Sequence, residues 1–344
     1  MAVTPPFLAA LRREPTTHTP VWFMRQAGRY MAEYRALRER YSLLDICAEP
    51  DLAAEVTLQP IRALGVDAAI IFADILLPLD ALGLGLRFAQ GEGPVIERPI
   101  RAPADVAALP AVEAREVLGN VGAAIALVRA ALTDGPPVIG FAGAPFTVAS
   151  YAIEGGSTRQ FIQVKRFMYE QPSAWHALME RLVEFSVGYL TSQVEGGAQA
   201  LQIFDSWVGV LDGADYTSYV LPHQRVLFDR LRGLAVPTIH FGVGAAHLLQ
   251  LQRDAGGDAI GLDWRTPLDE GWAIVGHDRA IQGNLDPVVL FAPWPEVERR
   301  IDAMLDRAAG RPGHVFNLGH GILPGTPVET VRRVVEHVHA RTAR

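Results

Sequence analysis

Two residue types that often carry chemistry are nearly missing from this sequence of 344 residues, which has one cysteine, Cys47, and one lysine, Lys165. A single cysteine excludes a disulfide within the chain and any zinc or iron–sulfur site built from several cysteines. The lysine lies in RQFIQVKRFMYEQ, a segment of helical character. A Schiff-base lysine at the end of a strand is therefore not expected.

The sequence also lacks a long uninterrupted apolar run. Its most apolar stretch, VDAAIIFADILLPLDALGLGL, contains Asp67, Asp74 and Asp80, which excludes a membrane-spanning helix. No basic leader followed by an apolar segment opens the chain, so we expect a cytoplasmic protein without a signal or transit peptide. The net charge of −7 argues against nucleic acid or an acidic membrane surface as a partner.

Several catalytic motifs are missing as well. The chain has no HExxH pattern, no GxSxG elbow, and GFAGAP lacks the lysine and the spacing of a phosphate-binding P-loop. His240 is followed by Phe241, with no cysteine near it. We predict a site without a metal and without an organic cofactor.

Short apolar runs recur along the chain, separated by longer stretches with helical periodicity. Such runs are typical of parallel strands buried on both faces, and eight of them predict a closed (β/α)8 barrel. We expect one barrel domain over residues 1–344, with a deep active-site cleft at the C-terminal ends of the strands. The eight runs are VWFM (21–24), AAIIF (68–72), PVIGF (137–141), ALQIF (200–204), PTIHF (237–241), DAIGLD (258–263), RAIQGN (279–284) and HVFNLG (314–319).

Other patterns predict the connecting elements. A helix should begin at Pro50 and stop at Gly65, and a long one over SAWHALMERLVEFSVGYLTSQVEGG should end at a glycine pair. Thr326 and Glu329 have the spacing of a capping box ahead of the last helix. Between the second and third strands, LRFAQGEGPVIERPI reads as a hairpin.

The loop after the first strand, RQAGR, presents Arg25 and Arg29 four positions apart. Guanidinium groups match a carboxylate or phosphate at two points, which predicts an anion clamp. The alternative is that each arginine pairs with an acid on a neighbouring helix.

Polar residues follow other strands. Asp74 lies in the apolar IIFADILLP, where its carboxylate needs partners or a proton; a helix N-cap or a buried ion pair is the alternative. Tyr151 could equally be a core-packing residue, and Ser206 could be only a helix cap. His320 lies between glycines, where backbone can approach a ligand, but a structural hydrogen bond is also possible.

Five motifs, in order, closely resemble the uroporphyrinogen decarboxylase family: PVWFMRQAGRYMAEYR, AAIIFADIL, GFAGAPFTVASYAIEGG, IFDSWVG and FNLGHGILP. The resemblance extends from about residue 15 to the last helix. It implies a (β/α)8 barrel, typically a homodimer, that removes four acetate carboxyl groups from uroporphyrinogen III to give coproporphyrinogen III without a cofactor.

The resemblance also implies which residues form the site. Catalytic roles fall on Asp74, Arg25, Arg29, Tyr151 and His320. The implied substrate-binding residues are Arg25, Gln26, Ala27, Gly28, Arg29, Phe72, Asp74, Tyr151, Phe204, Ser206 and His320.

The implied chemistry suits these residue types. Uroporphyrinogen carries eight carboxylates and four pyrrole N–H groups, so it needs cations at its rim and an acceptor at its centre. Asp74 could stabilise the cation formed when a pyrrole carbon is protonated. The proton donor stays open: His320 has a suitable ordinary pKa, and an arginine, Asp74, water or a substrate carboxylic acid are the other candidates.

Three other functions are alternatives for a chain with this predicted barrel. Corrinoid-dependent methyltransferases share this barrel but bind zinc through His and Cys, and this chain has no His-x-Cys pattern. A non-catalytic tetrapyrrole carrier or scaffold would not need Asp74. A phosphate-binding barrel enzyme of the aldolase type would need the strand-end lysine that is absent here.

Overall fold

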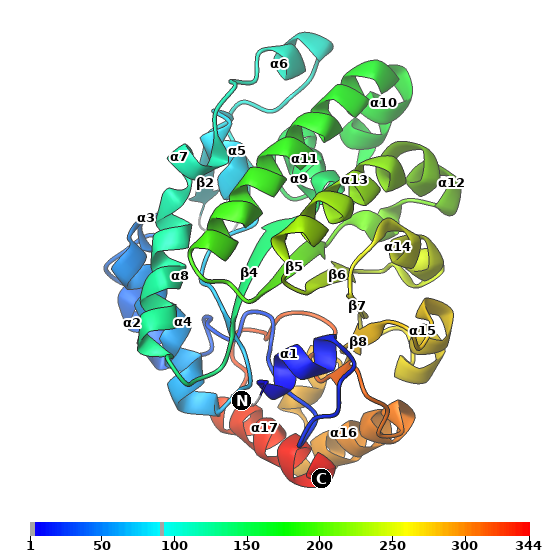
Figure 1. The fold of residues 1–344 in the computed structure, drawn as a ribbon. Helices are drawn as coiled ribbons and strands as arrows, with labels where there is room; N and C mark the ends of the chain where they lie inside the picture. The colour runs from blue at the N-terminus through cyan, green and yellow to red at the C-terminus, as the bar shows by residue number, and fades with distance from the viewer. Residues whose placement is uncertain (1–3, 90–92) are drawn as a thin grey trace.

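The computed structural model describes residues 4–89 and 93–344, and parallel strands form its centre (Figure 1). In the described residues, seven parallel strands form one sheet in the order β1-β4-β5-β6-β7-β8-β9, and helical segments join each strand to the next. The strands are β1 (Ala69–Ile70), β4 (Val138–Gly143), β5 (Ala200–Asp205), β6 (Thr238–Gly242), β7 (Ala259–Gly261), β8 (Ala280–Gln282) and β9 (His314–Val315).

The segment that closes the barrel is the one expected as its first strand, and that expectation needs a correction. Residues 21–24 form no regular strand and make a single parallel bridge, between Val21 and Phe316. The carbonyl of Val21 accepts a hydrogen bond from Asp67 N–H at 2.8 Å, so the segment still links the two edges of the sheet.

Side chains replace the missing strand ladder. The backbone N–H of Phe23 donates to Gln26 Oε1 at 3.2 Å, and that of Met24 donates to Asn317 Oδ1 at 3.3 Å. Buried backbone donors must be satisfied, and here two amide side chains satisfy them. The result is a (β/α)8 barrel in which seven strands form the regular sheet.

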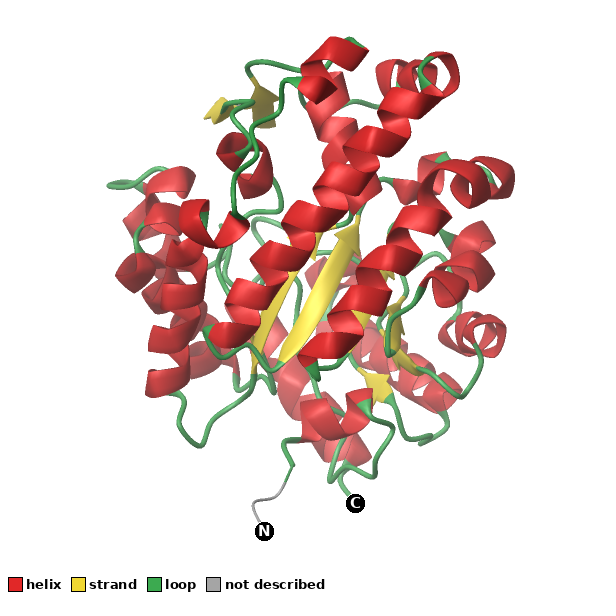
Figure 2. Cartoon of the chain, turned by 45° about the horizontal axis from the view of Figure 1, so that its top comes forward, coloured by secondary structure: helices red, strands yellow, loops and turns green. Residues whose placement is uncertain are grey.

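Helices surround this sheet on all sides (Figure 2). The α-helices are α1 (Pro6–Leu11), α2 (Ala32–Arg38), α3 (Leu43–Ala48), α4 (Pro50–Leu64), α5 (Leu77–Ala81), α6 (Pro103–Ala107), α7 (Ala114–Val117), α8 (Gly119–Ala131), α9 (Pro145–Glu154), α10 (Ile162–Glu170), α11 (Pro172–Glu195), α12 (Gly213–Asp215), α13 (Leu221–Leu231), α14 (Leu249–Ala255), α15 (Leu268–Val275), α16 (Trp294–Ala308) and α17 (Val328–Thr342). Single turns of other helix types are η1 (Val208–Val210), η2 (Tyr216–Val220), η3 (Arg232–Leu234), η4 (Ala246–Leu248) and η5 (Pro287–Phe291).

The predicted helix ends are confirmed at two helices and wrong at a third. Helix α4 stops at Gly65, which adopts the left-handed conformation with φ of 70°, and α11 ends just before Gly196. Helix α17 has no capping box, because the Thr326 hydroxyl donates back to the Leu323 carbonyl at 2.8 Å.

The insertion after β1 contains the predicted hairpin, formed by β2 (Leu86–Ala89) and β3 (Gly93–Ile96), which pair antiparallel. The hairpin lies away from the central sheet (Figure 2). It returns to the barrel through a bridge between Val95 and Gly156, just beyond the end of α9.

The N-terminal end of the barrel is closed by α1. Its Phe7, Leu8 and Leu11 are buried in one hydrophobic cluster with residues near the start of the strands, including Ile139 and Ile239. Apolar packing of this kind stabilises the end of the barrel that carries no chemistry. Functional residues are therefore expected at the opposite end.

Candidate active site

The RQAGR turn is built by Gln26. Its side chain is fully buried; Nε2 donates to the Ala68 carbonyl at 3.0 Å, while Oε1 accepts from Phe23 N–H. The Tyr30 hydroxyl donates to the Gln26 carbonyl at 2.6 Å. Because both amide atoms of Gln26 are used by backbone, the side chain supports the turn, and contact with a substrate stays a prediction.

The turn leaves both of its arginines exposed, and Ala27 and Gly28 partly so. Arg25 has a φ of 59°, an uncommon conformation for a residue with a side chain. Across residues 4–89 and 93–344, neither Arg25 nor Arg29 has a carboxylate within 4.0 Å. The alternative that they are structural ion pairs is therefore not supported, and both charges are available to a ligand.

Asp74 lies at the C-terminal side of β1, in the turn before α5. Its Oδ1 accepts a hydrogen bond from Leu76 N–H at 2.9 Å, so one oxygen serves the local turn. Burial raises the pKa of this carboxyl above its usual value, against the opposing effects of the Leu76 N–H and the Arg25 charge. This is the environment of a carboxyl group that can hold a proton more readily than a surface acid.

Tyr151, on α9, lies flat against Trp207. The ring centroids are 3.7 Å apart, and the planes differ by 26°. Burial raises the pKa of the Tyr151 phenol to about 12, helped by the Asp74 charge. The phenol is therefore neutral at physiological pH and can donate a hydrogen bond.

Phe72 and Phe204, the predicted wall residues, pack against other aromatic side chains near the ends of β1 and β5, and their contact with a substrate stays a prediction. Phe204 makes edge contacts with Phe141 and Phe241, at centroid distances of 5.5 and 6.1 Å. Phe72 packs against Tyr34 at 5.4 Å, and both phenylalanines are only partly buried. Ser206 follows Phe204 in the turn after β5 and is also partly buried.

His320 is held in one tautomer. Its Nδ1 accepts a hydrogen bond from Gly321 N–H at 2.8 Å, which leaves Nε2 to carry the proton of the neutral ring. Burial lowers the pKa of His320 to about 4, and the charges of Arg25 and Arg265 lower it further against Asp263. At neutral pH the ring is a hydrogen-bond donor without charge.

Arg25 is the common neighbour of these groups. Its charge affects the pKa of Asp74 after β1, of Tyr151 on α9 and of His320 after β9, which are far apart in the sequence. A Cβ added at Gly321 would lie 2.6 Å from Arg25 Cδ, so the arginine passes closely over the loop of His320. Within the described residues, no hydrogen bond joins the Arg29 or Ser206 side chain to this group.

Comparison with known proteins decides the family. The model of the family described as "Uroporphyrinogen decarboxylase (URO-D)" matches residues 3–341. The chain belongs to the uroporphyrinogen decarboxylase family. It is 58% identical over 342 residues to the uroporphyrinogen decarboxylase of Roseiflexus sp. (strain RS-1), covering 98% of each chain. It is 55% identical over 333 residues to that of Carboxydothermus hydrogenoformans, covering 97% of this chain and 95% of the relative.

Solved structures support the fold. A methyltransferase from Methanosarcina mazei matches with a TM-score of 0.81 over 98% of both chains, at 20% sequence identity. A B12-independent methionine synthase from Shewanella sp. W3-18-1 matches with a TM-score of 0.57, at 10% identity, over 85% of this chain and 88% of its own. These likenesses concern the barrel only, whereas the sequence relatives carry the family.

Sequence reasoning missed Trp207 as part of the site, although it lies in the quoted IFDSWVG motif two positions after β5. It also left out Arg265, which follows β7. The Arg265 guanidinium lies 3.9 Å above the Trp264 ring and bonds Asp263 at 2.8 Å. Its position just beyond a strand end was the signal that could have indicated it.

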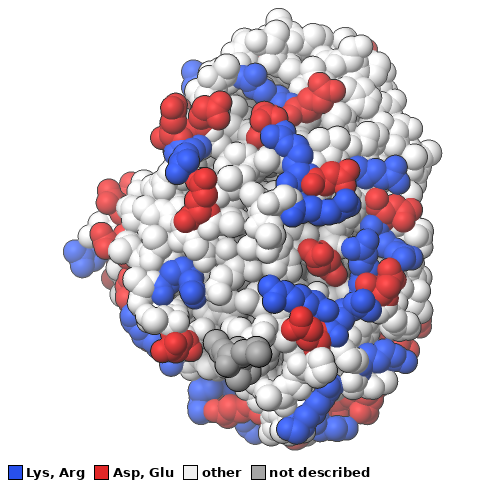
Figure 3. Space-filling model, viewed as in Figure 1, with Lys and Arg blue, Asp and Glu red and all other residues white. Residues whose placement is uncertain are grey.

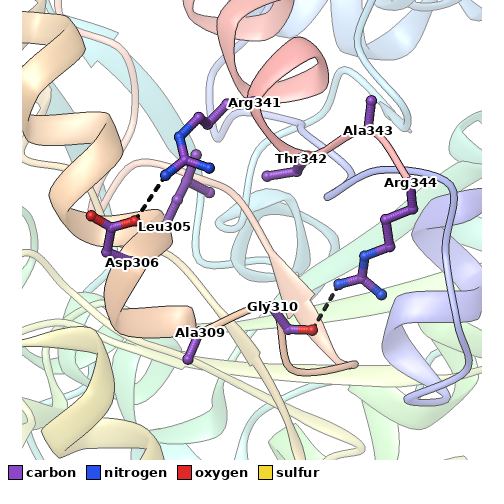
Figure 4. Close-up of a pocket in the computed structure, with 8 residues that line it drawn as sticks. All are labelled: Leu305, Asp306, Ala309, Gly310, Arg341, Thr342, Ala343 and Arg344. Carbon is purple, nitrogen blue, oxygen red and sulfur yellow. Dashed lines mark hydrogen bonds and ion pairs between the residues drawn. The ribbon is translucent and has the colours of Figure 1, made fainter.

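Neither of two hollows in the described part of the chain is lined by Asp74, Tyr151 or His320. One, of about 360 Å³, lies between the C-terminal ends of α16 and α17, where Arg341 bonds Asp306 and Arg344 bonds the Gly310 carbonyl (Figure 4). The other, of about 230 Å³, is lined by Trp264 and Arg265 after β7 and by Asn284 and Leu285 after β8. A cleft over Asp74 therefore stays a prediction.

At the opposite end of the barrel, Asp67 joins three segments. His18 Nε2 lies 2.9 Å from Asp67 Oδ1, and His339 Nε2 lies 2.7 Å from Oδ2. The ligand atoms of these three residues lie within 4.8 Å of one another, a grouping that could hold a metal ion. The distances are those of hydrogen bonds, and Val21 N–H also donates to Oδ2, so the cluster braces the barrel.

Proposed function

We propose that this chain converts uroporphyrinogen III to coproporphyrinogen III and CO₂ by removing the carboxyl groups of four acetate side chains, with no metal or organic cofactor. The observation that carries the proposal is that Arg25, which forms no ion pair among the described residues, exerts its charge on Asp74, a buried carboxyl group whose pKa is raised. Membership of the uroporphyrinogen decarboxylase family supplies the substrate.

The site residues divide between the rim and the centre of such a substrate. Arg25 and Arg29 would bind acetate and propionate carboxylates, because guanidinium forks match carboxylates at two points. Ser206 and the neutral His320, through Nε2–H, would donate to further carboxylates. Asp74 would face the pyrrole N–H groups, and Phe72 and Phe204 would form the apolar wall.

Decarboxylation needs an electron sink, which the pyrrole ring provides once a ring carbon is protonated. The bond to the carboxyl carbon then breaks, CO₂ leaves, and its electron pair neutralises the ring. The exocyclic carbon takes a proton to become a methyl group, and the ring loses the proton it gained. Each cycle therefore exchanges one CO₂ for one proton, without oxidation.

Asp74 is the group best suited to this exchange. Its raised pKa allows it to carry a proton more readily than an ordinary aspartic acid, whereas a guanidinium gives up its proton only at high cost. After delivering the proton, the carboxylate stabilises the cationic ring, and in a low-dielectric site this effect is large. Tyr151, neutral and held by Trp207, would orient Asp74 or the substrate.

Other expectations for this chain remain proposals on the same basis. We propose that residues 1–344 form one domain, that the substrate enters a cleft at the C-terminal strand ends, and that the protein is a cytoplasmic homodimer. No helix among the described residues has the length and apolar character needed to cross a membrane. Acidic and basic side chains alternate over the visible face, which offers no broad basic surface for nucleic acid (Figure 3).

The deciding experiment is incubation of the purified protein with uroporphyrinogen III under reducing conditions, followed by chromatography that separates porphyrins by carboxyl number. We expect products with seven to four carboxyl groups, ending at coproporphyrin. Recovery of the octacarboxylate alone would contradict the proposal. Zinc content measured on the same preparation tests the methyltransferase alternative, which requires a stoichiometric, tightly bound ion.

A further inference from the structure

Strand β5, which leads to Ser206, and helix α9, which carries Tyr151, are joined by a buried polar unit outside the predicted set of site residues. Its centre is Thr147 on α9. The Thr147 hydroxyl donates to Asp205 Oδ1 at 2.8 Å and accepts from Trp207 N–H at 3.2 Å. One hydroxyl therefore connects the last residue of β5 to the turn beyond it.

A second contact lies one helical turn away. Thr147 and Tyr151 are four positions apart on α9 and therefore share one face of the helix. The Trp207 ring stacks on Tyr151 at 3.7 Å, and Phe161 contacts the same indole edge-on at 5.0 Å. The turn after β5 is thus fixed to α9 at two levels, by its backbone N–H at Thr147 and by its ring at Tyr151.

Asp205 anchors this arrangement. It is fully buried, and its second oxygen accepts from Gln224 Nε2 at 2.9 Å, which ties the unit to α13. A buried carboxylate is costly, and within the described residues it has no cationic partner. Burial raises the pKa of Asp205 to about 7, against the hydrogen bonds from Thr147 and Gln224. Such a cost is characteristic of functional regions, where it is offset by the rest of the fold.

We propose that Thr147 and Asp205 are positioning residues for the reaction: through Trp207 they hold the Tyr151 phenol and the Ser206 turn in the geometry that decarboxylation needs. The inference rests on the proposed function and adds residues that do not touch the substrate. It predicts a fall in kcat, because a displaced Tyr151 affects the transition state, and a smaller rise in KM, because the Ser206 contact weakens while Arg25 and Arg29 still bind the carboxylates.

The test compares two substitutions at position 147 with a control on the same helix. Thr147→Val keeps the volume but removes the hydroxyl, whereas Thr147→Ser keeps the hydroxyl. Ser150 is the control, because it is buried on α9 and its hydroxyl donates only to the Phe146 carbonyl, at 2.7 Å. We expect kcat to fall roughly 10- to 100-fold in Thr147→Val. Thr147→Ser and Ser150→Ala should stay near the parental kcat.

Two substitutions at position 205, Asp205→Asn and Asp205→Ala, keep the proposal testable if Thr147→Val folds poorly. Gln224 Oε1 is buried and has no hydrogen-bond partner among the residues that the structure describes. An asparagine at 205 could accept from Thr147 and donate to that oxygen after the Gln224 amide turns over. Asp205→Asn should therefore retain most of the turnover, while Asp205→Ala should lose it to the same extent as Thr147→Val.

The double variant Thr147→Val/Tyr151→Phe shows whether the effect passes through Tyr151. If it does, Thr147→Val costs far less in the Tyr151→Phe background than in the parent, because coupled residues are not additive. Equal losses in both backgrounds, or parental kcat in folded Thr147→Val, would overturn the inference. An inactive parent would instead overturn the proposed function, so the two failures are distinguishable.

Discussion

The Nδ1 atom of His320 accepts a hydrogen bond from the backbone N–H of Gly321, with 2.8 Å between the two nitrogens. Together with a pKa lowered to about 4, chiefly by burial, this bond keeps the ring neutral with its proton on Nε2. We therefore expect His320 to act as a neutral donor to a substrate carboxylate and not as the acid that supplies the reacting proton.

His320→Asn should therefore lower kcat/KM by roughly 10- to 100-fold, the effect of losing one hydrogen bond to a charged group. The pH dependence of kcat between about pH 6 and 8 should stay that of the parent. The exposed His277→Asn is the matched control. If an ionisation of the parent in this range disappears in His320→Asn, the ring does act as an acid or base.

Gly321 gives a way to move Arg25 without replacing it. A Cβ at position 321 would lie 2.6, 2.8 and 3.2 Å from Arg25 Cδ, Cγ and Cβ, so Gly321→Ala should displace the guanidinium. We expect KM for uroporphyrinogen to rise about tenfold or more, the effect of about 1.4 kcal/mol of lost binding. Gly233→Ala is the control, since a Cβ there meets nothing within 4 Å. Equal steady-state constants for the two variants would place Arg25 outside the substrate site.

Asp205 predicts the sign of a pH effect on stability. The pKa of Asp205 is about 7 in the folded protein and 3.8 in the unfolded chain. The contribution of the protonated Asp205 to folding stability is therefore fully present below pH 3.8 and is lost as the pH rises through 7. Asp205→Asn removes that dependence, and the variant should gain stability relative to the parent between pH 5 and pH 8. Urea unfolding at both pH values measures the difference. A constant difference would mean that Asp205 does not titrate in this range.

Asp67 should behave in the opposite way. Burial alone would raise its pKa, but hydrogen bonds from His339, His18 and Val21 and the His339 charge outweigh burial and lower it. The stabilisation is present above the ordinary value of 3.8 and is lost as pH falls through the lower folded pKa.

We expect Asp67→Asn to cost roughly 1–3 kcal/mol of unfolding free energy at pH 7, because buried partners lose their acceptor. The cost should shrink below pH 3.8. Denaturant unfolding measures it, with Asp51→Asn, on the exposed first turn of α4, as the control. A cost that is independent of pH would assign the effect to packing.

Strand ends were predictable because parallel strands leave a clear apolar pattern, and Arg25, Asp74 and His320 all follow such runs. The closure of the barrel was not predictable in the same way. The side-chain oxygens of Gln26 and Asn317 accept the backbone hydrogen bonds that a strand partner would otherwise accept, and a sequence pattern does not show which backbone group a side-chain amide will bind. For the same reason Thr326 matched a capping pattern yet bonds Leu323.

The side-chain contacts within the candidate site were also not predictable from the sequence. Tyr151 and Ser206 were expected at the site from their motifs, but the stacking of Trp207 on Tyr151 depends on how α9 and β5 pack. Thr147 and Asp205 gave no periodic signal either, because a buried polar pair is recognised only by its partners.

Asp74 is the central group of the proposed decarboxylation, and the most direct test of its role is the turnover of Asp74→Asn with uroporphyrinogen III. Asparagine keeps the side-chain volume and an oxygen that can accept from Leu76 N–H, but it carries neither the proton nor the charge. We predict that the variant folds like the parent and loses most of its turnover, with the octacarboxylate remaining. A folded Asp74→Asn that produces coproporphyrinogen at the parental rate would contradict the central role of this carboxyl group.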